Sequence, residues 1–508
     1  MNSLIIVILI SLGDTLINQE KPEAYNYITN YGLLGGERYL WRWGLSWPGI
    51  IFNNWYADEL EFAIGTKING IPYVTTNYFN YSSSFKREWD AGELIYHGPG
   101  VSEEDVILEW NDYISNPYNP TGRHTGIKVI CRTYTWSYEP WNDFIPYEFF
   151  VIWNKNECDI PNVPDTLDSL FVGILCNFDI SGSDPTDPYN DDLAFFDGYV
   201  AHEWDTLGYP YDSITLLPDS FLNIPDGIYD QYIVYGNDSL EHTIHGDTLI
   251  LPRNLGYMWD DDDPFTPGND TGEDGASAGY PGVALLYAPP SPADSTWICN
   301  YCGDTCRIPR VWAFHWWVGN FHPSDTILYQ WLSGNPIRFN YKYYLATPLM
   351  WCLISSGPFK IADRETLKFV FVLAVGQGMN GGDDLYWGRG WIRGLRQTID
   401  YALTAYYAGS EISDPYHPSG PDEDIHWKIL SISEKNYKKI SLNLPTILTP
   451  SYILKTKEPL KIEIYNASGR KIKEIFVKDK ETPFKNLKGG IYFIKLNKEE
   501  FKKFIILH

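Results

Sequence analysis

Residues 367–375 read LKFVFVLAV, a run in which Lys368 is the single charged residue. The run is short for a helix, and its β-branched and aromatic side chains favour a buried strand. Residues 60–65 and 71–75 lie on either side of Asn69-Gly70, a dipeptide that is the strongest short-range signal for a β-hairpin. These stretches predict a chain that is built mainly from strands.

The composition also favours a mostly β fold with few helices. Tyr and Trp are abundant, at 38 and 20 residues, and the 42 Gly and 34 Pro favour turns over long helices. Residues 391–408 are the best helix candidate, because apolar residues recur there at helical spacing. The segment Ser102-Glu103-Glu104-Asp105 resembles a capping box and predicts the start of a short helix.

Charge is divided unevenly along the 508 residues, whose formal net charge is −26. Residues 1–427 hold 21 Lys and Arg against 57 Asp and Glu, whereas residues 428–508 hold 18 against 8. Such a change marks a domain boundary. We expect a β-rich passenger over residues 18–426, as one large or two packed units, then a linker over 427–450 and a small C-terminal β-sandwich over 451–508. The acidity argues against nucleic acid as a partner, because phosphate binding needs clustered Lys and Arg.

The first residues are typical of a secretory signal. Residues 4–10 read LIIVILI, a run that suits a signal-peptide core and is far shorter than the roughly 20 residues that span a bilayer. Small residues at Ser11 and Gly13 predict cleavage after Gly13, so that residues 1–13 form the signal peptide. A buried N-terminal strand is the alternative, because the segment lacks Lys and Arg. No later segment has 18 consecutive apolar residues, and we expect no transmembrane span.

The C-terminal residues alternate between strand and turn patterns in a distinctive order. Tyr465 ends one alternating run, Gly469 ends a turn, and Arg470 begins the next strand. Gly490-Ile491-Tyr492 then begins a later strand ahead of a basic and apolar final strand. This order resembles the C-terminal sorting domain of the type IX secretion system. The resemblance implies a β-sandwich, a partner in the type IX secretion machinery, and export to the outer surface or surroundings of a Gram-negative bacterium. It implies no catalytic activity.

Short motifs ahead of this tail are similar in order to those of other large passengers of the same system. They include YMWD at residues 257–260 and GYPGV at residues 279–283. This second resemblance implies a fold and no particular chemistry.

Two acidic clusters are candidate calcium sites. Calcium prefers six to eight hard oxygen ligands, and carboxylates crowded into one loop repel one another unless a cation lies between them. The candidate ligands are Asp179 and Asp191 in the first cluster, and Asp260, Asp262, Asp270 and Glu273 in the second. Neither cluster has the EF-hand pattern. A solvated acidic loop and an acid–base carboxylate pair, as in glycosidases, are the alternatives.

Three of the seven cysteines, Cys299, Cys302 and Cys306, lie close together. In an exported protein this spacing predicts at least one disulfide. Zinc held by these thiolates with His315 or His322 is one alternative, and free thiols are another.

The sequence contains no P-loop. The spacing G-x-S-x-G occurs once, at residues 275–279, directly after the second acidic cluster. Residues 376–381 have the spacing of a dinucleotide fingerprint after the strand at 367–375, but a loop composition follows where that motif needs a helix. None of these patterns assigns a catalytic activity. Six tryptophans are candidate platforms for sugar rings, although the same residues suit a β-sandwich core. They are Trp136, Trp141, Trp153, Trp316, Trp317 and Trp331. We therefore expect a structural or binding role at the cell surface, with a glycan or another surface molecule as candidate ligand. The alternative is a secreted hydrolase that acts on polysaccharide.

Overall fold

The structure is a computed structural model of the chain, and it separates two compact units, residues 1–430 and 431–508. The described residues of the first unit are 15–19, 21–37, 44–48, 55–80, 84–113, 124–178, 180, 192–197, 232–234, 243–244, 247–248, 250–260, 279–289, 291, 298–301, 304–307, 311–318, 323–335, 350–379, 381–383, 391–407 and 427. Those of the second unit are 447–448, 454–455, 460–466, 471–477, 480–481, 490–496 and 500–506.

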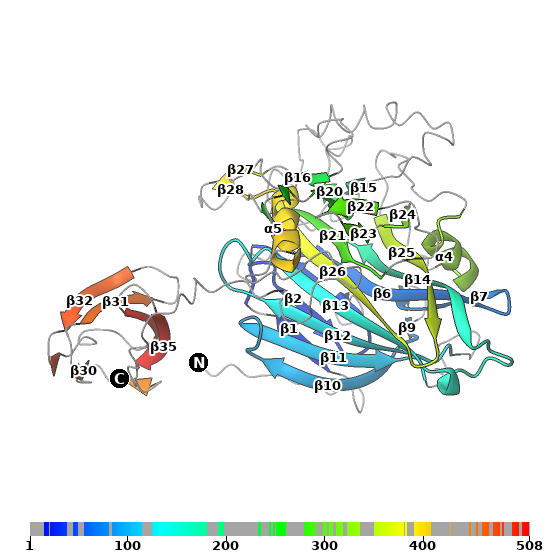
Figure 1. The fold of residues 1–508 in the computed structure, drawn as a ribbon, viewed down its shortest axis with the longest axis horizontal. Coiled ribbons are helices and arrows are strands. Elements are labelled where there is room, and N and C mark those ends of the chain that lie inside the picture. Colours follow the sequence, from blue (N-terminus) through cyan, green and yellow to red (C-terminus); the bar gives the residue numbers. More distant parts are fainter. Residues whose placement is uncertain are drawn as a thin grey trace. The chain divides into compact units, whose positions relative to one another are not determined.

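An eight-stranded antiparallel sheet forms one layer of the first unit (Figure 1). In spatial order its strands are β10 (Asp90–Gly98), β11 (Glu104–Asn111), β12 (Ile127–Thr135), β13 (Phe144–Trp153), β26 (Thr366–Gln377), β21 (Gly279–Tyr287), β20 (Leu255–Asp260) and β15 (Asp192–Asp197). The run at residues 367–375 therefore lies in β26, the strand that joins an early meander to a later one. A neighbour on each side satisfies its backbone groups, as its apolar composition predicts.

A six-stranded antiparallel sheet forms the facing layer. Its main path is β24 (Ala313–Val318), β25 (Met350–Ala362), β14 (Thr166–Asn177), β6 (Glu59–Ile68) and β3 (Leu33–Glu37), and β7 (Ile71–Thr75) pairs with β6. Asn69 and Gly70 join β6 to β7 with φ angles of 54° and 81°. Both angles are positive, as in the tight turns that Asn-Gly favours, and the expected hairpin is confirmed.

The main core lies between the two sheets. Phe62 on β6 and Phe149 on β13 are fully buried, and their rings stack with centroids 4.2 Å apart. Side chains alternate between faces along each strand, so Phe369 and Phe371 of β26 join this core while Val370 and Val372 point to the other face of the sheet.

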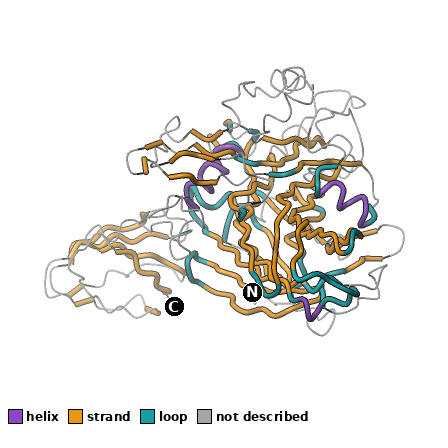
Figure 2. The backbone as a smooth tube through the Cα atoms, turned by 45° about the vertical axis from the view of Figure 1, so that its right-hand side comes forward, coloured by secondary structure: helices purple, strands orange, loops and turns teal. Residues whose placement is uncertain are grey.

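One helix covers the outer face of each sheet. The helix α5 (Leu395–Tyr407) packs on β26 and β21, and α4 (Asp325–Leu332) packs on the six-stranded sheet. The helix expected over residues 391–408 is confirmed, except that Trp391–Ile392 forms β28, which pairs with β27 (Gly382–Asp383). Figure 2 shows the helices as short segments among strands, so the expected mostly β chain with few helices is confirmed.

Two largely buried ion pairs and one tryptophan hold α5 in place. Arg253 donates to both carboxylate oxygens of Asp400, at 2.9 and 3.1 Å, and Arg393 donates to Asp143 at 2.6 Å. Trp427 is fully buried against α5, with its ring 5.2 Å from that of Tyr406.

Shorter elements complete the first unit. They are β1 (Leu16–Gln19) with β2 (Asn26–Thr29), β4 (Gly44–Ser46) with β5 (Trp55–Ala57), β8 (Asn77–Asn80) with β9 (Ser84–Arg87), β16 (Tyr232–Val234) with β19 (Ile250–Pro252), β17 (Thr243–Ile244) with β18 (Asp247–Thr248), β22 (Ile298–Tyr301) with β23 (Asp304–Arg307), and the short 3₁₀ helix Lys155–Glu157. In the part of the chain that the structure describes, no helix is both long and apolar enough to cross a bilayer.

The second unit is also built from strands. Its sheet has the order β29 (Ile447–Leu448), β35 (Glu500–Ile506), β34 (Gly490–Leu496), β31 (Leu460–Asn466) and β32 (Lys471–Val477). A separate pair consists of β30 (Leu454–Lys455) and β33 (Lys480–Glu481). The linker expected over residues 427–450 stays a prediction.

Candidate functional site

An aromatic cluster on the outer face of the six-stranded sheet is the candidate ligand site of the first unit. It consists of His315 and Trp317 on β24, Trp351 on β25 and Trp331 on α4. Trp317 and Trp351 are register partners, so their side chains project from the same face of the sheet, where α4 lies. The centroid of Trp331 is 4.5 Å from that of His315 and 4.9 Å from that of Trp317, which in turn lies 5.6 Å from Trp351. The four rings thus form a continuous row.

Two polar atoms in this cluster have no hydrogen-bond partner in the structure: Nδ1 of His315 and Nε1 of Trp317. Burial lowers the pKa of His315 to about 4, so its imidazole is neutral near pH 7. Trp317 is 6% exposed, whereas His315 and Trp331 are only half-buried. Ile327, one turn before Trp331 on α4, is 37% exposed. The row therefore runs from a buried end to an open one, and its two unpartnered polar atoms are themselves buried.

The other candidate tryptophans pack within the protein and are not part of this cluster. Trp136, Trp153 and Trp316 are buried, and Trp316 points into the main core because it alternates with Trp317 along β24. Trp141 is half-buried and packs edge-on against Phe144 and Tyr401.

One described residue from each acidic region pairs with the other across two strands, and Asp192 directly follows Asp191 of the first cluster. Asp260 is the last residue of β20 and is the register partner of Asp192, the first residue of β15. Asp192 is buried, and its carboxylate accepts a hydrogen bond from the backbone N–H of Ile180 at 3.3 Å. The remaining candidate ligands lie outside the described residues: Asp179, Asp191, Asp262, Asp270 and Glu273. Among the described residues, no group of three or more His, Cys, Asp or Glu side chains is placed to hold a metal ion.

The clustered cysteines lie on a hairpin. Cys299 on β22 and Cys306 on β23 are register partners, while Cys302 lies outside the described residues. His322, a candidate zinc ligand, also lies outside them, and His315 belongs to the aromatic cluster.

The segment that begins at Ser102 is a turn, so the helix expected there is wrong. Asp105 accepts hydrogen bonds from the backbone N–H groups of Val101 and Ser102, at 2.6 and 2.8 Å, and from the Ser102 hydroxyl. These bonds close a turn, and β11 begins at Glu104. A carboxylate three residues after a serine suits either structure, and here the side chain satisfies the turn instead of a helix terminus.

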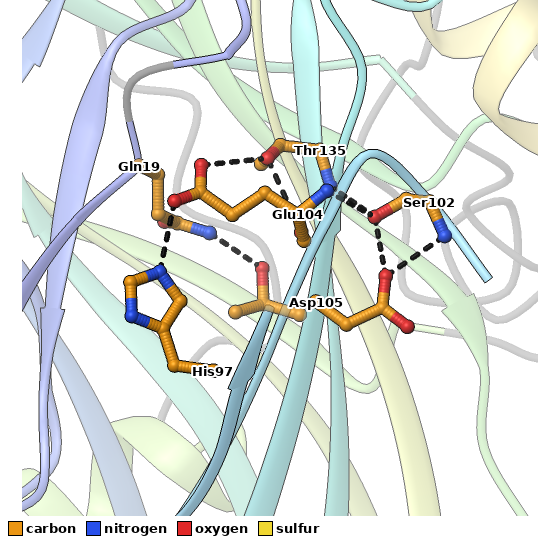
Figure 3. A network of polar contacts seen from close by, with 7 residues as sticks. Gln19, His97, Ser102, Glu104, Asp105 and Thr135 are labelled. Atoms are coloured by element: carbon orange, nitrogen blue, oxygen red, sulfur yellow. Dashed lines mark hydrogen bonds and ion pairs between the residues drawn. The ribbon is translucent and has the colours of Figure 1, made fainter. Parts of the chain in front are cut away.

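A polar network ties this turn to its neighbours (Figure 3). His97 on β10 contacts Glu104 at 3.0 Å, Thr135 on β12 donates to Glu104 at 3.3 Å, and the backbone N–H of Thr135 donates to the Ser102 hydroxyl at 3.0 Å. Figure 3 shows the Ser102 hydroxyl directed at Asp105, away from His97. His97 and Ser102 use different carboxylates, so this network is not a nucleophile relay and instead joins three strands at the edge of the sheet.

In the second unit, the motif residues of the tail lie on two adjacent strands. Tyr465 on β31 is the register partner of Phe493, and Tyr492 on β34 is the partner of Asn466. Gly490 and Ile491 begin β34, whereas Gly469 and Arg470 lie outside the described residues. The two tyrosines thus belong to paired ends of neighbouring strands.

Comparison with known proteins assigns the C-terminal segment to a family. Residues 439–507 match the family model described as secretion system C-terminal sorting domain. No curated protein matches the chain. Among solved structures, the chain is similar to a polysaccharide lyase at 6% identity and a TM-score of 0.23, over 97% of this chain and 46% of that one. The chain spans less than half the length of that structure, and a likeness this distant carries no argument about function. By its sequence match, the segment 439–507 is a type IX secretion C-terminal sorting domain, and the chain that carries it is exported to the extracellular space or the outer cell surface.

Proposed function

We propose that the exported chain is a binding protein of the cell surface and that its aromatic cluster contacts a glycan. The observation that carries this proposal is the row of four rings from His315 to Trp351, which contains two polar atoms without partners. Small-molecule sites in proteins combine aromatic walls with a few polar groups that fix the orientation of the ligand. The apolar faces of sugar rings can stack on the aromatic rings, and their hydroxyl groups can pair with the polar groups.

The half-buried end of the row defines the expected contact. Trp331 and His315 present partly open faces, so a sugar ring would stack there first. A neutral imidazole carries one N–H and one acceptor nitrogen, and either can pair with a hydroxyl group. Trp317 Nε1 can only donate.

Affinity electrophoresis through gels that contain β-glucan, xylan, mannan or chitosan tests the proposal. We expect at least one polysaccharide to retard the exported protein. Trp331→Ala should raise the dissociation constant for that polysaccharide by about 30-fold or more, as for a binding hot spot. Trp141→Ala is the matched control, because Trp141 is also half-buried but lies against Phe144 and Tyr401. Equal loss in both variants, or no retardation by any polysaccharide, would overturn the proposal. Shortening of the polysaccharide would favour the hydrolase alternative.

We also propose a structural calcium ion where β15 begins and β20 ends. Support comes from the register of Asp192 with Asp260: Asp192 follows Asp191 of the first cluster, and Asp260 belongs to the second. We expect millimolar Ca²⁺ to raise the thermal midpoint and the double variant Asp260→Ala, Asp270→Ala to remove that rise. Asp168→Ala, a change to an exposed carboxylate with a 66% exposed side chain, is the control. An equal rise with Mg²⁺ at matched ionic strength would contradict a calcium site.

We further propose that Cys299 and Cys306 form the disulfide of the clustered cysteines. Their register across β22 and β23 supports this pairing, because opposite residues in an antiparallel pair lie within disulfide range. Peptide mapping of unreduced protein should link these two residues. Stoichiometric zinc, with all three thiols reactive after chelation, would favour the metal alternative.

A further inference from the structure

A second pair of cysteines lies on the two central strands of the six-stranded sheet. Cys176 on β14 and Cys352 on β25 are register partners in an antiparallel pair. Register partners in such a pair have Cα atoms about 4.5 or 5.5 Å apart, and both values lie within the range of about 4.4–6.8 Å that a disulfide needs. The backbone therefore already satisfies the first geometric condition for a cross-link.

Both side chains point the same way. Cys176 and Cys352 belong to the core between the two sheets and are 1% and 2% exposed. Ile174 and Ile354, two residues away on the same strands, belong to the same core and are also register partners. The two thiols are free in this structure and are hydrogen-bonded to each other.

We infer that Cys176 and Cys352 are joined by a disulfide in the exported protein. The inference depends on export, which the sorting domain establishes, and is independent of the proposed glycan binding. Secreted proteins fold in compartments where disulfides form and persist. Sequence spacing gave no sign of this pair, because the two cysteines lie on strands that are far apart in the chain.

The Cys176–Cys352 bond would form by thiol–disulfide exchange with the disulfide of a protein oxidoreductase. The two thiols lose two protons and two electrons, one sulfur–sulfur bond forms, and the oxidant's disulfide is reduced to two thiols. Burial, with a smaller contribution from Cys352, raises the pKa of the Cys176 thiol in the folded chain. Exchange needs an accessible thiolate, so the bond must form before β14 and β25 are covered by the facing sheet.

Peptide mapping of the exported full-length protein tests the inference. The protein is unfolded in guanidinium chloride with N-ethylmaleimide and without reductant, and is then digested. We expect one peptide pair that contains Cys176 and Cys352, lighter by two hydrogen atoms than the sum of its parts and separated by reductant. Cys131 is the internal control, because it is buried in the same core but its register partners are Leu108 and Phe149. It should be fully labelled.

Single variants sharpen the test. Cys352→Ala should leave Cys176 labelled, whereas Cys131→Ala should leave the linked pair intact. Labelling of both Cys176 and Cys352 in the unmodified protein would overturn the inference, and so would a link from either residue to another cysteine. The mapping of unmodified protein decides the matter even where a variant is not exported.

Discussion

At the end of β11, the Asp112 carboxylate is 3% exposed and is surrounded by donors. Its oxygens accept hydrogen bonds from the hydroxyls of Thr75 and Thr125 and from the backbone N–H groups of Thr125 and Ile127. These donors favour the ionised form, but removal from water outweighs them and raises the pKa of Asp112 to about 6. This residue is therefore protonated more readily in the folded chain than in the unfolded one.

The raised pKa gives Asp112 a definite effect on the pH dependence of stability. Its contribution is complete below the unfolded pKa of about 3.8 and is lost as the pH rises to about 6. Asp112→Asn cannot take up a proton, so its destabilisation relative to the natural chain should grow by about 3 kcal/mol or less between pH 7 and pH 4. Urea unfolding at both pH values measures this difference. Asp168→Asn, at an exposed position, should show no such growth, and a constant penalty at Asp112 would contradict the assignment.

Local sequence could not have identified this residue. A single aspartate after a strand pattern usually lies in solvent. Its donors come from Thr75 on β7 and from the segment that begins β12, and only the assembled sheets bring them together. The same limit applies to Trp316 and Trp317: the period of two places them on opposite faces, but it does not reveal which face opens outward.

At the scale of elements, α5 is fixed to the sheet by charged side chains as well as by its apolar face. The Arg253–Asp400 pair is bidentate, and its side chains are 13% and 10% exposed. Breaking such a pair leaves an unpaired buried charge, whereas replacing both partners with apolar residues removes the desolvation cost.

We therefore expect Arg253→Ala to lower the free energy of unfolding by about 3 kcal/mol, and the double variant Arg253→Leu, Asp400→Leu to regain most of that loss. Urea unfolding of these variants and of the single variants Arg253→Leu and Asp400→Leu, which complete a double-mutant cycle, measures both effects. Lys155→Ala is the comparison, because Lys155 pairs with an Asp165 side chain that is 96% exposed, and stability should hardly change. Additive effects of the substitutions at Arg253 and Asp400 would show that the pair is not coupled.

Trp427 joins the same helix to β12 and β13. Its Nε1 donates to Glu148 at 3.1 Å, and its ring contacts Tyr134, Phe144 and Tyr406. Trp427→Ala should cost about 3–5 kcal/mol through the cavity it leaves. Trp391→Ala removes an indole that is 56% exposed and should cost far less. Similar losses of unfolding free energy at both sites, measured by urea unfolding, would show that packing of Trp427 against α5 contributes little to stability.

Elements with strong local patterns were predicted well. Local sequence alone was enough to predict three elements, because each has a clear residue period or turn signal: β26, the hairpin at Asn69-Gly70, and α5. The turn at Ser102 was misassigned because Asp105 satisfies backbone groups in a way that the capping pattern does not distinguish. Strand order could not be predicted either, since β26 pairs with two strands that are distant in sequence.

At the scale of the whole molecule, the chain separates into an acidic unit and a basic sorting domain. The apolar cores of the first unit are described entirely within residues 1–430. Its fold is therefore expected to persist without residues 431–508, whereas its route out of the cell depends on them.

Deletion of residues 431–508 should leave a folded protein that accumulates inside the cell envelope. Its thermal midpoint should match that of the passenger in the full chain, and immunoblots should find it absent from the culture medium and cell surface. Intact-mass measurement on the exported full chain should show the loss of residues 1–13, because these resemble a cleaved signal. Export of the deletion variant at normal levels would contradict the role of the tail.

The place of β26 in the eight-stranded sheet has a consequence for the order of synthesis. The meander from β10 to β13 can pair as soon as residues 90–153 are made, but β13 and β21 keep open edges until residues 366–377 arrive between them. The ring of Trp427 arrives later still, just ahead of the sorting domain. A chain that stops early therefore exposes two unpaired strand edges, which invite aggregation and proteolysis. The export signal is thus carried only by chains that already contain every residue needed to close the fold.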